Sequence, residues 1–322
     1  MINYTDCDIL AIKTLDDFLP QKIFDAHMHI SLYPFAQSDK FGIDDYKRDT
    51  APIFSGRYVR CAALATPTNE LKDSECHEKT IKFFENQLDL FPDCVGSVMV
   101  KPEESYDDIS SHVNHHRIKG LKCYHKYAKR VDTDKADIHE YLSHDALSFA
   151  NDHKMAITLH LVKERALADQ TNMKEIKAIA QNYPNIKLIL AHSARAFAPW
   201  TVIESVSKLV SLENVFFDFS AICESASIIA ILKKIGVSRC LWGSDYNVSA
   251  SIGKAISIGD GFYWINEEDI SRFPKFDKIH SRHIIVENLM AVREASMLSE
   301  LSSNDVEDIF YNNACNVFDV VG

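Results

Sequence analysis

Short apolar runs alternate with amphipathic stretches along this chain. Eight runs have the length and residue types of buried β-strands, and they span residues 22–30, 58–67, 94–102, 118–127, 155–162, 186–194, 214–222 and 239–247. Helical spacing of apolar residues marks the segments between them, at 76–90, 140–153, 173–182, 201–211 and 224–235. Strands that are apolar on both faces and separated by helices are typical of a parallel sheet covered on both sides.

Eight strand–helix units is the number that closes a (β/α)8 barrel of the α/β class. No linker or shift in composition divides the 322 residues. We therefore predict a single barrel over residues 1–322, with residues 1–21 as an N-terminal extension. An open doubly wound sheet is the main rival, but it would more often show a glycine-rich turn after the first strand. Here that strand ends in His-Met-His instead.

Two connections of the predicted barrel are long and contain no obvious helix. They are residues 31–57 after the first strand and 248–281 after the eighth. Strands 1 and 8 are neighbours in a closed barrel, so both loops would cover the same side of its mouth. Loops of this length are often functional. Their aromatic side chains either wall a pocket or pack within their own loops; they are Tyr33, Phe35, Phe262, Tyr263 and Trp264.

Composition narrows the classes of partner and location. The formal net charge is −11, and an acidic surface argues against nucleic acid or an anionic membrane as a partner. Eight cysteines without a C-x-x-C pair are typical of a reduced, cytoplasmic protein. We expect no secretory signal, since the first residues carry Asp6 and Asp8 and no basic segment. No apolar run reaches the roughly 18 residues of a membrane span. A homo-oligomer is not excluded.

Metal-competent side chains recur at the ends of the predicted strands. His27 and His29 alternate within the first strand, so both imidazoles lie on one face. His160, His192 and Asp245 follow the fifth, sixth and eighth apolar runs. Burying such groups is costly unless something satisfies them, and a metal ion does so. The pattern therefore predicts a metal site at one end of the barrel.

These segments resemble the signature of the amidohydrolase superfamily. The similarity is carried by DAHMH (25–29), ITLH (157–160), LILAHSA (188–194) and LWGSDY (241–246), and extends to FFDFSA (216–221) and IFYNNACNVF (309–318). It is greatest to the amidohydrolase-2 branch that includes aminocarboxymuconate-semialdehyde decarboxylase. The resemblance implies that one divalent metal, commonly zinc, is bound by His27, His29, His160 and Asp245. It also implies that His192 lies near the metal-bound water or substrate, as a base or an electrostatic stabiliser.

The chemistry of these residues agrees with that implication. Three imidazoles and one carboxylate suit Zn²⁺ and leave a position for water or substrate. Asp245 can accept the proton of that water, so we predict Asp245 and His192 as catalytic residues. His192 is equally consistent with a second metal ligand, or with a histidine satisfied by a backbone carbonyl.

Lys122, at the end of the fourth apolar run, leaves the number of metal ions open. Some superfamily members use a carboxylated lysine there to bridge two metals. We favour one metal, with the Lys122 ammonium facing the pocket and binding a substrate carboxylate. Arg195 and Arg165 are further candidate substrate-binding residues, because they follow the sixth and fifth strands on the predicted catalytic face. Both are also consistent with a solvated rim.

The sequence thus predicts a metal-dependent hydrolase acting on a C–O or C–N bond of a small anionic, carbonyl-containing substrate. One alternative is non-oxidative decarboxylation of an unsaturated or aromatic carboxylic acid, which uses the same metal and base. A second alternative is a barrel that binds a ligand without catalysis. Asp218, deeper in its strand, is expected to accept a hydrogen bond from a ligating histidine.

Overall fold

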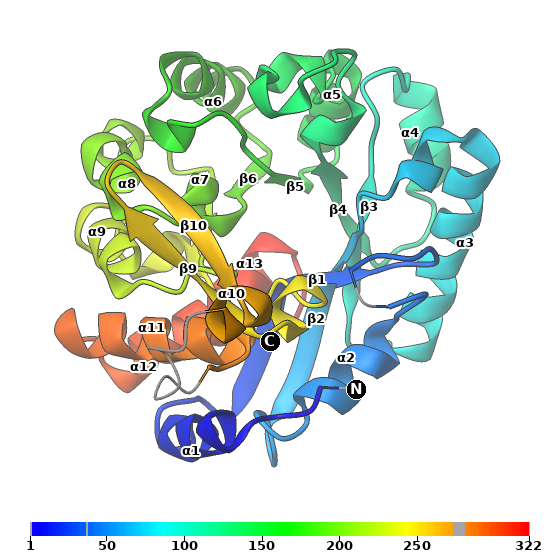
Figure 1. The fold of residues 1–322 in the computed structure, drawn as a ribbon. Helices are drawn as coiled ribbons and strands as arrows, with labels where there is room; N and C mark the ends of the chain where they lie inside the picture. Colours follow the sequence, from blue (N-terminus) through cyan, green and yellow to red (C-terminus); the bar gives the residue numbers. More distant parts are fainter. Residues whose placement is uncertain (1, 37, 273–280, 322) are drawn as a thin grey trace.

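The computed structural model describes residues 2–36, 38–272 and 281–321, and it contains the predicted barrel (Figure 1). Eight strands form one parallel sheet in sequence order. The Ala26 amide donates to the Trp242 carbonyl at 2.9 Å, and a parallel bridge joins Met28 to Tyr246, so the eighth strand meets the first. The strands are β1 (Lys22–Ile30), β2 (Tyr58–Ala65), β3 (Val95–Met99), β4 (Ile118–Cys123), β5 (Ala156–Leu159), β6 (Lys187–Leu190), β7 (Val215–Asp218) and β8 (Cys240–Leu241).

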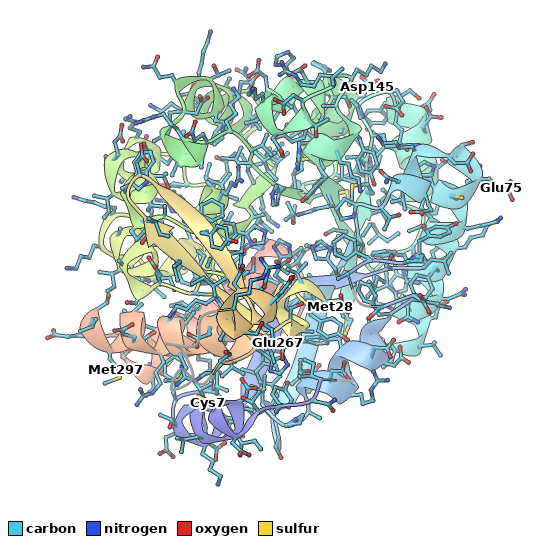
Figure 2. The ribbon with its side chains drawn as sticks, viewed as in Figure 1. Cys7, Met28, Glu75, Asp145, Glu267 and Met297 are labelled. Carbon is cyan, nitrogen blue, oxygen red and sulfur yellow. The ribbon has the colours of Figure 1, made fainter. Side chains whose placement is uncertain are left out.

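Helices surround this ring, and side chains fill its middle (Figures 1 and 2). Several helices begin where a polar side chain accepts a backbone N–H of the first turn, as Asp73, Ser105 and Asp169 do. The helices are α1 (Asp6–Leu15), α2 (Ile43–Thr50), α3 (Ser74–Leu90), α4 (Tyr106–His112), α5 (His144–Asp152), α6 (Gln170–Asn182), α7 (His192–Arg195), α8 (Pro199–Ser205), α9 (Ser225–Ile235), α10 (Glu267–Ser271), α11 (Ile284–Leu298), α12 (Ser303–Glu307) and α13 (Asn313–Val317).

Most strands are shorter than the apolar runs that predicted them. The run 118–127, for example, ends its strand at Cys123 and continues as a 3₁₀ turn over His125–Tyr127. Apolar residues beyond the strand ends stay buried because they line the loops at the barrel mouth, so burial alone does not mark where the sheet stops.

The two long connections are present, but the expectation that they lack regular structure is wrong. Residues 31–57 include α2. Its sequence is mostly polar, but Ile43, Tyr46 and Thr50 are buried. The connection after β8 contains a hairpin of β9 (Gly253–Ile258) and β10 (Gly261–Asn266), followed by α10. In Figure 1 this hairpin extends from the barrel mouth toward α8 and α9. Residues 273–280 of the predicted loop lie outside the described residues.

The N-terminal extension is fixed to the body of the protein by buried polar contacts. The Asp8 carboxylate of α1 accepts the backbone N–H of His283 at 2.9 Å and lies 2.7 Å from its Nδ1. Both side chains are almost fully buried. α1 is therefore anchored beside the start of α11. No helix among the described residues is long and apolar enough to cross a membrane.

Candidate active site

Three metal-competent atoms converge at the carboxyl end of β1 and the segment after β8. His27 and His29 lie on one face of β1, with their Nε2 atoms 3.2 Å apart. The Asp245 Oδ1 atom is 3.5 Å from His27 Nε2 and 3.4 Å from His29 Nε2. All three residues are buried. They thus form a compact triangle of two nitrogens and one oxygen.

This triangle fits a divalent metal ion. Ligand atoms held at about 2.1 Å from a tetrahedral Zn²⁺ are separated from each other by about 3.4 Å. The three observed separations bracket that value. Two imidazole nitrogens that face each other inside the protein also require a cation or a proton between them. The donor set is one that zinc and similar first-row metals accept.

Asp218, at the end of β7, orients His27 for this role. His27 Nδ1 donates to Asp218 Oδ2 at 2.9 Å, because a carboxylate there can only accept. The hydrogen on Nδ1 leaves the lone pair of Nε2 toward the metal position. The expected hydrogen bond from a histidine to Asp218 is present, although Asp218 ends its strand rather than lying deeper in it. His29 differs, since its buried Nδ1 has no hydrogen-bond partner among the described residues.

His192 shares the same carboxylate through its backbone. Its amide donates to Asp218 Oδ1 at 3.0 Å, and its Nδ1 lies 3.0 Å from the carbonyl oxygen of Ser220. A carbonyl only accepts, so Nδ1 carries the hydrogen and Nε2 keeps the lone pair. The Ser220 hydroxyl lies between the two rings, 3.2 Å from His27 Nδ1 and 2.9 Å from His192 Nδ1. Sequence patterns gave no signal for Ser220.

The segment α7, directly after β6, is a left-handed turn rather than an ordinary right-handed helix. The φ angles of His192, Ser193, Ala194 and Arg195 are +51°, +48°, +64° and +62°. Four consecutive left-handed residues without glycine are costly, at roughly 1–2 kcal/mol each. The Ser193 hydroxyl donates to the Asp218 carbonyl at 2.8 Å and helps to hold the turn. The turn positions His192 and Arg195 so that both side chains line one cavity.

That cavity, of about 280 Å³, opens at the carboxyl ends of the strands. Its lining combines polar groups with aromatic rings, and the Phe197 ring centre lies 5.3 Å from that of His192. The predicted aromatic residues Phe35, Phe262 and Trp264 line it, whereas Tyr263 is half exposed and the Tyr33 hydroxyl donates to the Cys76 carbonyl. The lining residues are His29, Phe35, Pro67, Tyr124, His160, His192, Arg195, Phe197, Asp245, Val248, Phe262 and Trp264.

His160 lines this cavity without joining the compact triangle of ligand atoms. Its ring centre lies 5.2 Å from that of His192 and 4.6 Å from that of Tyr124. Burial lowers the pKa of His160 well below its ordinary value, and lowers that of His27 to about 4. Both imidazoles are therefore neutral near pH 7, which is the form that binds metals.

Lys122 is buried inside the barrel and, contrary to the expectation that it faces the pocket, is not among the residues that line the cavity. Its ammonium has no hydrogen-bond partner among the described residues, and it lies 5.9 Å from the centre of the Tyr124 ring. Burial lowers its pKa, while Asp218 and Asp245 act in the opposite direction. A buried, unpaired cation next to the metal-competent cluster is a costly arrangement that an anionic ligand would relieve.

The two candidate arginines lie in different surroundings. Arg195 lines the cavity, with its guanidinium 5.2 Å from the Phe262 ring centre and Nη1 donating to the Lys163 carbonyl at 3.3 Å. Arg165 is half exposed and pairs with both oxygens of Glu204 at 3.1 and 3.0 Å. It is not among the residues that line the cavity, so the structure does not bring Arg165 to the site.

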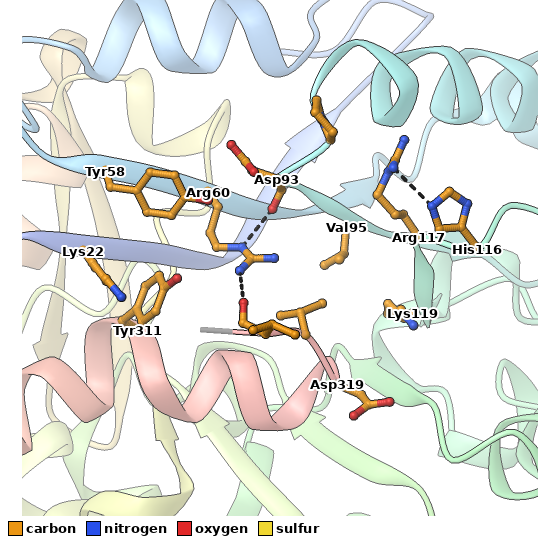
Figure 3. Close-up of a pocket in the computed structure, with 13 residues that line it drawn as sticks. Lys22, Tyr58, Arg60, Asp93, Val95, His116, Arg117, Lys119, Tyr311 and Asp319 are labelled. Atoms are coloured by element: carbon orange, nitrogen blue, oxygen red, sulfur yellow. Dashed lines mark hydrogen bonds between the residues drawn. The ribbon is translucent and has the colours of Figure 1, made fainter.

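A larger cavity, of about 620 Å³, lies at the opposite end of the barrel (Figure 3). It lies where β1, β2 and β3 begin. Arg60 in its wall donates to the carbonyls of Asp93 and Val321. None of the predicted site residues lines this cavity. Because (β/α)8 enzymes carry their active sites at the carboxyl ends of the strands, the smaller cavity is the candidate active site.

The closed barrel and the histidine–aspartate cluster at its mouth define a barrel enzyme with the ligands for a metal ion. The chain belongs to the amidohydrolase family, whose model matches residues 24–320. No curated protein matches the sequence.

Solved structures share the fold at low sequence identity. An amidohydrolase from Burkholderia multivorans with bound zinc is 12% identical with a TM-score of 0.59, over 93% of this chain and 99% of the other. The 5-carboxyvanillate decarboxylase from Novosphingobium aromaticivorans, with manganese and 4-hydroxy-3-methoxy-5-nitrobenzoic acid, is 11% identical with a TM-score of 0.58 (95% and 97%). A protein from Pseudomonas putida named as a 2-pyrone-4,6-dicarboxylic acid hydrolase is 13% identical with a TM-score of 0.58 (94% and 98%).

Proposed function

We propose that this protein is a metal-dependent decarboxylase of a small aromatic or unsaturated carboxylic acid. The observation that carries the proposal is one cavity lined both by metal-competent groups and by aromatic rings. The similarity to structures of aromatic-acid decarboxylases supports it. The hydrolysis that the sequence pattern predicted first is not confirmed, and the decarboxylase alternative agrees better with the comparisons.

We propose that His27, His29 and Asp245 hold the metal, together with His160. Both zinc and manganese are bound in similar structures, and of the two we propose zinc because imidazole is the dominant donor here. A metal bound there supplies positive charge that holds and polarises the oxygen atoms of the substrate. One metal is expected. A carboxylated Lys122 would instead serve as a ligand to two metal ions.

The size and lining of the cavity suit a flat anion. At about 280 Å³ it is at the small end of ligand pockets, which usually span about 300–1,000 Å³. The Phe197 ring centre lies 5.0 Å from Phe262 and 5.1 Å from Trp264, so these rings form a continuous apolar wall. Arg195 lies beside that wall and offers a positive charge to a carboxylate. Lys122 does not line the cavity, so direct binding of a substrate carboxylate falls to Arg195.

Decarboxylation breaks the bond between the ring carbon and the carboxyl carbon and releases CO₂. The electron pair left on the ring carbon takes up one proton. Asp245 and His192 line the cavity and can each hold a proton, so we assign them to its delivery. Burial would raise the pKa of Asp245, but the neighbouring histidines His192, His29 and His27 lower it overall. Asp245 is therefore ionised in the free protein, and the proton that it delivers to the ring carbon would first be taken from water or from an acidic group of the substrate.

Hydrolysis of a C–O or C–N bond is the second candidate, favoured by the similarity to the Pseudomonas putida hydrolase. The same Asp245 would then accept a proton from water.

The eight cysteines are free, and this supports the expectation that the protein acts in the reducing cytoplasm.

The test begins with metal content per chain in protein purified without chelator, followed by a screen of hydroxybenzoates, unsaturated acids and lactones. We expect about one zinc that depends on His27 and His29, and CO₂ release from a carboxylic acid that is abolished in the Asp245→Asn variant with the fold retained. Lactone or amide turnover without CO₂ would replace decarboxylation by hydrolysis. Binding without any turnover would favour a ligand-binding barrel, and no metal uptake would refute the proposal.

A further inference from the structure

A second group of metal-competent side chains lies outside the barrel, between α3 and α4. The two helices lie side by side on one flank of the molecule (Figure 1), and the ring centres of His77 and His112 are 5.0 Å apart. His77 is in the first turns of α3, Glu104 is in the connection before α4, and His112 ends α4. The Glu104 Oε1 atom is 3.3 Å from Nδ1 of each histidine.

The hydrogen bonds around this group fix what each atom offers. His77 Nε2 lies 3.1 Å from the Met99 carbonyl, which only accepts, so Nε2 carries the hydrogen. In the neutral ring, Nδ1 then presents its lone pair toward Glu104. The carboxylate is held in place because its Oε2 atom accepts the Lys101 amide at 2.6 Å. Two electron-rich atoms thus face each other across 3.3 Å.

His112 adds a third such atom. Its Nδ1 is buried and has no hydrogen-bond partner among the described residues, although it lies 3.3 Å from the same carboxylate oxygen. The geometry is therefore poor for a hydrogen bond to that oxygen. Separations of about 3.3 Å are again close to the ligand–ligand distance in a tetrahedral site with bonds of about 2.1 Å. His77 and Glu104 are buried, so water does not satisfy them well.

We propose that His77, Glu104 and His112 bind a second divalent metal ion, of the zinc class, at this position. The ion joins α3 to α4 and to the connection between β3 and α4. His77 also contacts the carbonyl of Met99, the residue that pairs with Lys122 in the sheet. The site is thus structural, with three protein ligands and a remaining position for water. It does not depend on the reaction proposed for the barrel.

The charge of the group agrees with this role. The Lys101 amide that donates to the Glu104 Oε2 atom favours the ionised carboxylate, which is the form that binds metals. The competing arrangement is a proton on His77 that forms an ion pair with Glu104, which would leave His112 Nδ1 without a partner.

The experiment isolates this site by removing the barrel ligands. A His27→Asn/His29→Asn variant is freed of metal with a chelator, mixed with Zn²⁺, desalted and assayed for zinc per chain. We expect one zinc to remain and the melting temperature to rise on zinc addition. Adding His112→Asn should weaken this binding by roughly 100-fold, because one of three ligands is lost. His116→Asn, an exposed histidine of the next connection, is the matched control and should change nothing.

Two results would overturn the proposal. One is a His27→Asn/His29→Asn variant that folds, as judged by circular dichroism, and holds no zinc. The other is equal zinc binding with and without His112→Asn. If the barrel variant does not fold, zinc-soaked crystals of the wild-type protein decide the question. An anomalous peak between His77, Glu104 and His112 supports the site, and a peak at the barrel mouth alone refutes it.

Discussion

The Asp218 carboxylate offers a sharp test of how the site is held. Its two oxygens accept the His27 Nδ1–H and the backbone N–H groups of His192 and Ser220. Asp218→Asn keeps the shape of the side chain, and its remaining oxygen can still accept the two backbone amides. The amide nitrogen, however, then faces His27 Nδ1–H, and two donors cannot share a hydrogen bond.

His27 can relieve this conflict only by changing its tautomer. Nδ1 then accepts from the new side-chain amide, and Nε2 carries a hydrogen toward the metal position instead of a lone pair. Loss of such a supporting partner usually costs about 10- to 100-fold in metal affinity or activity. This corresponds to about 1.4–2.7 kcal/mol. We expect Asp218→Asn to reach the upper part of that range, because the change reverses the polarity of a ligand atom.

The assay is competition for Zn²⁺ between the protein and a chelator of known affinity, together with kcat/KM on the substrate found by screening. Asp8→Asn is the matched control. It removes the charge from a second buried carboxylate–histidine pair, Asp8 and His283, at α1 and outside the barrel mouth. Zinc affinity within threefold of wild type in Asp218→Asn, with the fold intact, would refute the argument from the His27 tautomer.

Three further predictions concern the cavity, the N-terminal helix and the packing behind β1. Arg195→Ala should raise KM for a carboxylate substrate by about 10- to 100-fold, while Arg165→Ala should leave it unchanged; equal effects would place neither at the substrate. Burial alone would raise the pKa of Asp8, but hydrogen bonds from His283 and Thr5 lower it below 3.8. The wild-type advantage over Asp8→Asn in urea unfolding of the metal-free protein should therefore be full at pH 7 and decrease as the pH falls below the ordinary pKa of an aspartate; an advantage that stays constant as the pH falls would contradict this. In Gly243→Ala the new Cβ would lie 2.6 Å from His27 Cβ. We therefore expect the free energy of unfolding, measured in urea, to fall by about 1–3 kcal/mol and zinc binding to weaken. Wild-type stability together with wild-type zinc affinity would show that β1 shifts without cost to accept the new methyl group.

The strands and the residues at their ends were predictable because both depend on local pattern. The run 22–30 matches β1 in full, and alternation within it places His27 and His29 on one face. Asp245 follows an apolar run that ends at the same barrel mouth, so closure of the barrel brings Asp245 close to His27 and His29. The family motifs supplied the same residues independently.

What the sequence did not predict depends on contacts between distant segments. The hairpin of β9 and β10 has a local signal, the Gly259–Asp260 pair between the two strands, yet its position over the cavity follows only from the fold. Nothing near His112 in the sequence shows that α3 brings His77 beside it. Arg165 follows β5 in the chain as Arg195 follows β6, but a nearby glutamate, Glu204, holds it outside.

The left-handed turn at His192–Arg195 restricts how this region of the chain can change in evolution. Side chains branched at Cβ are poorly tolerated with positive φ, so valine, isoleucine and threonine are excluded from Ser193 and Ala194. Glycine and asparagine would relax the turn, yet glycine would also loosen the spacing between the histidine and the arginine. Selection for stability and selection for the geometry of the cavity therefore favour different residues at the same two positions. New substrate preferences should arise through the β9–β10 hairpin, which is less constrained, while this turn stays as it is.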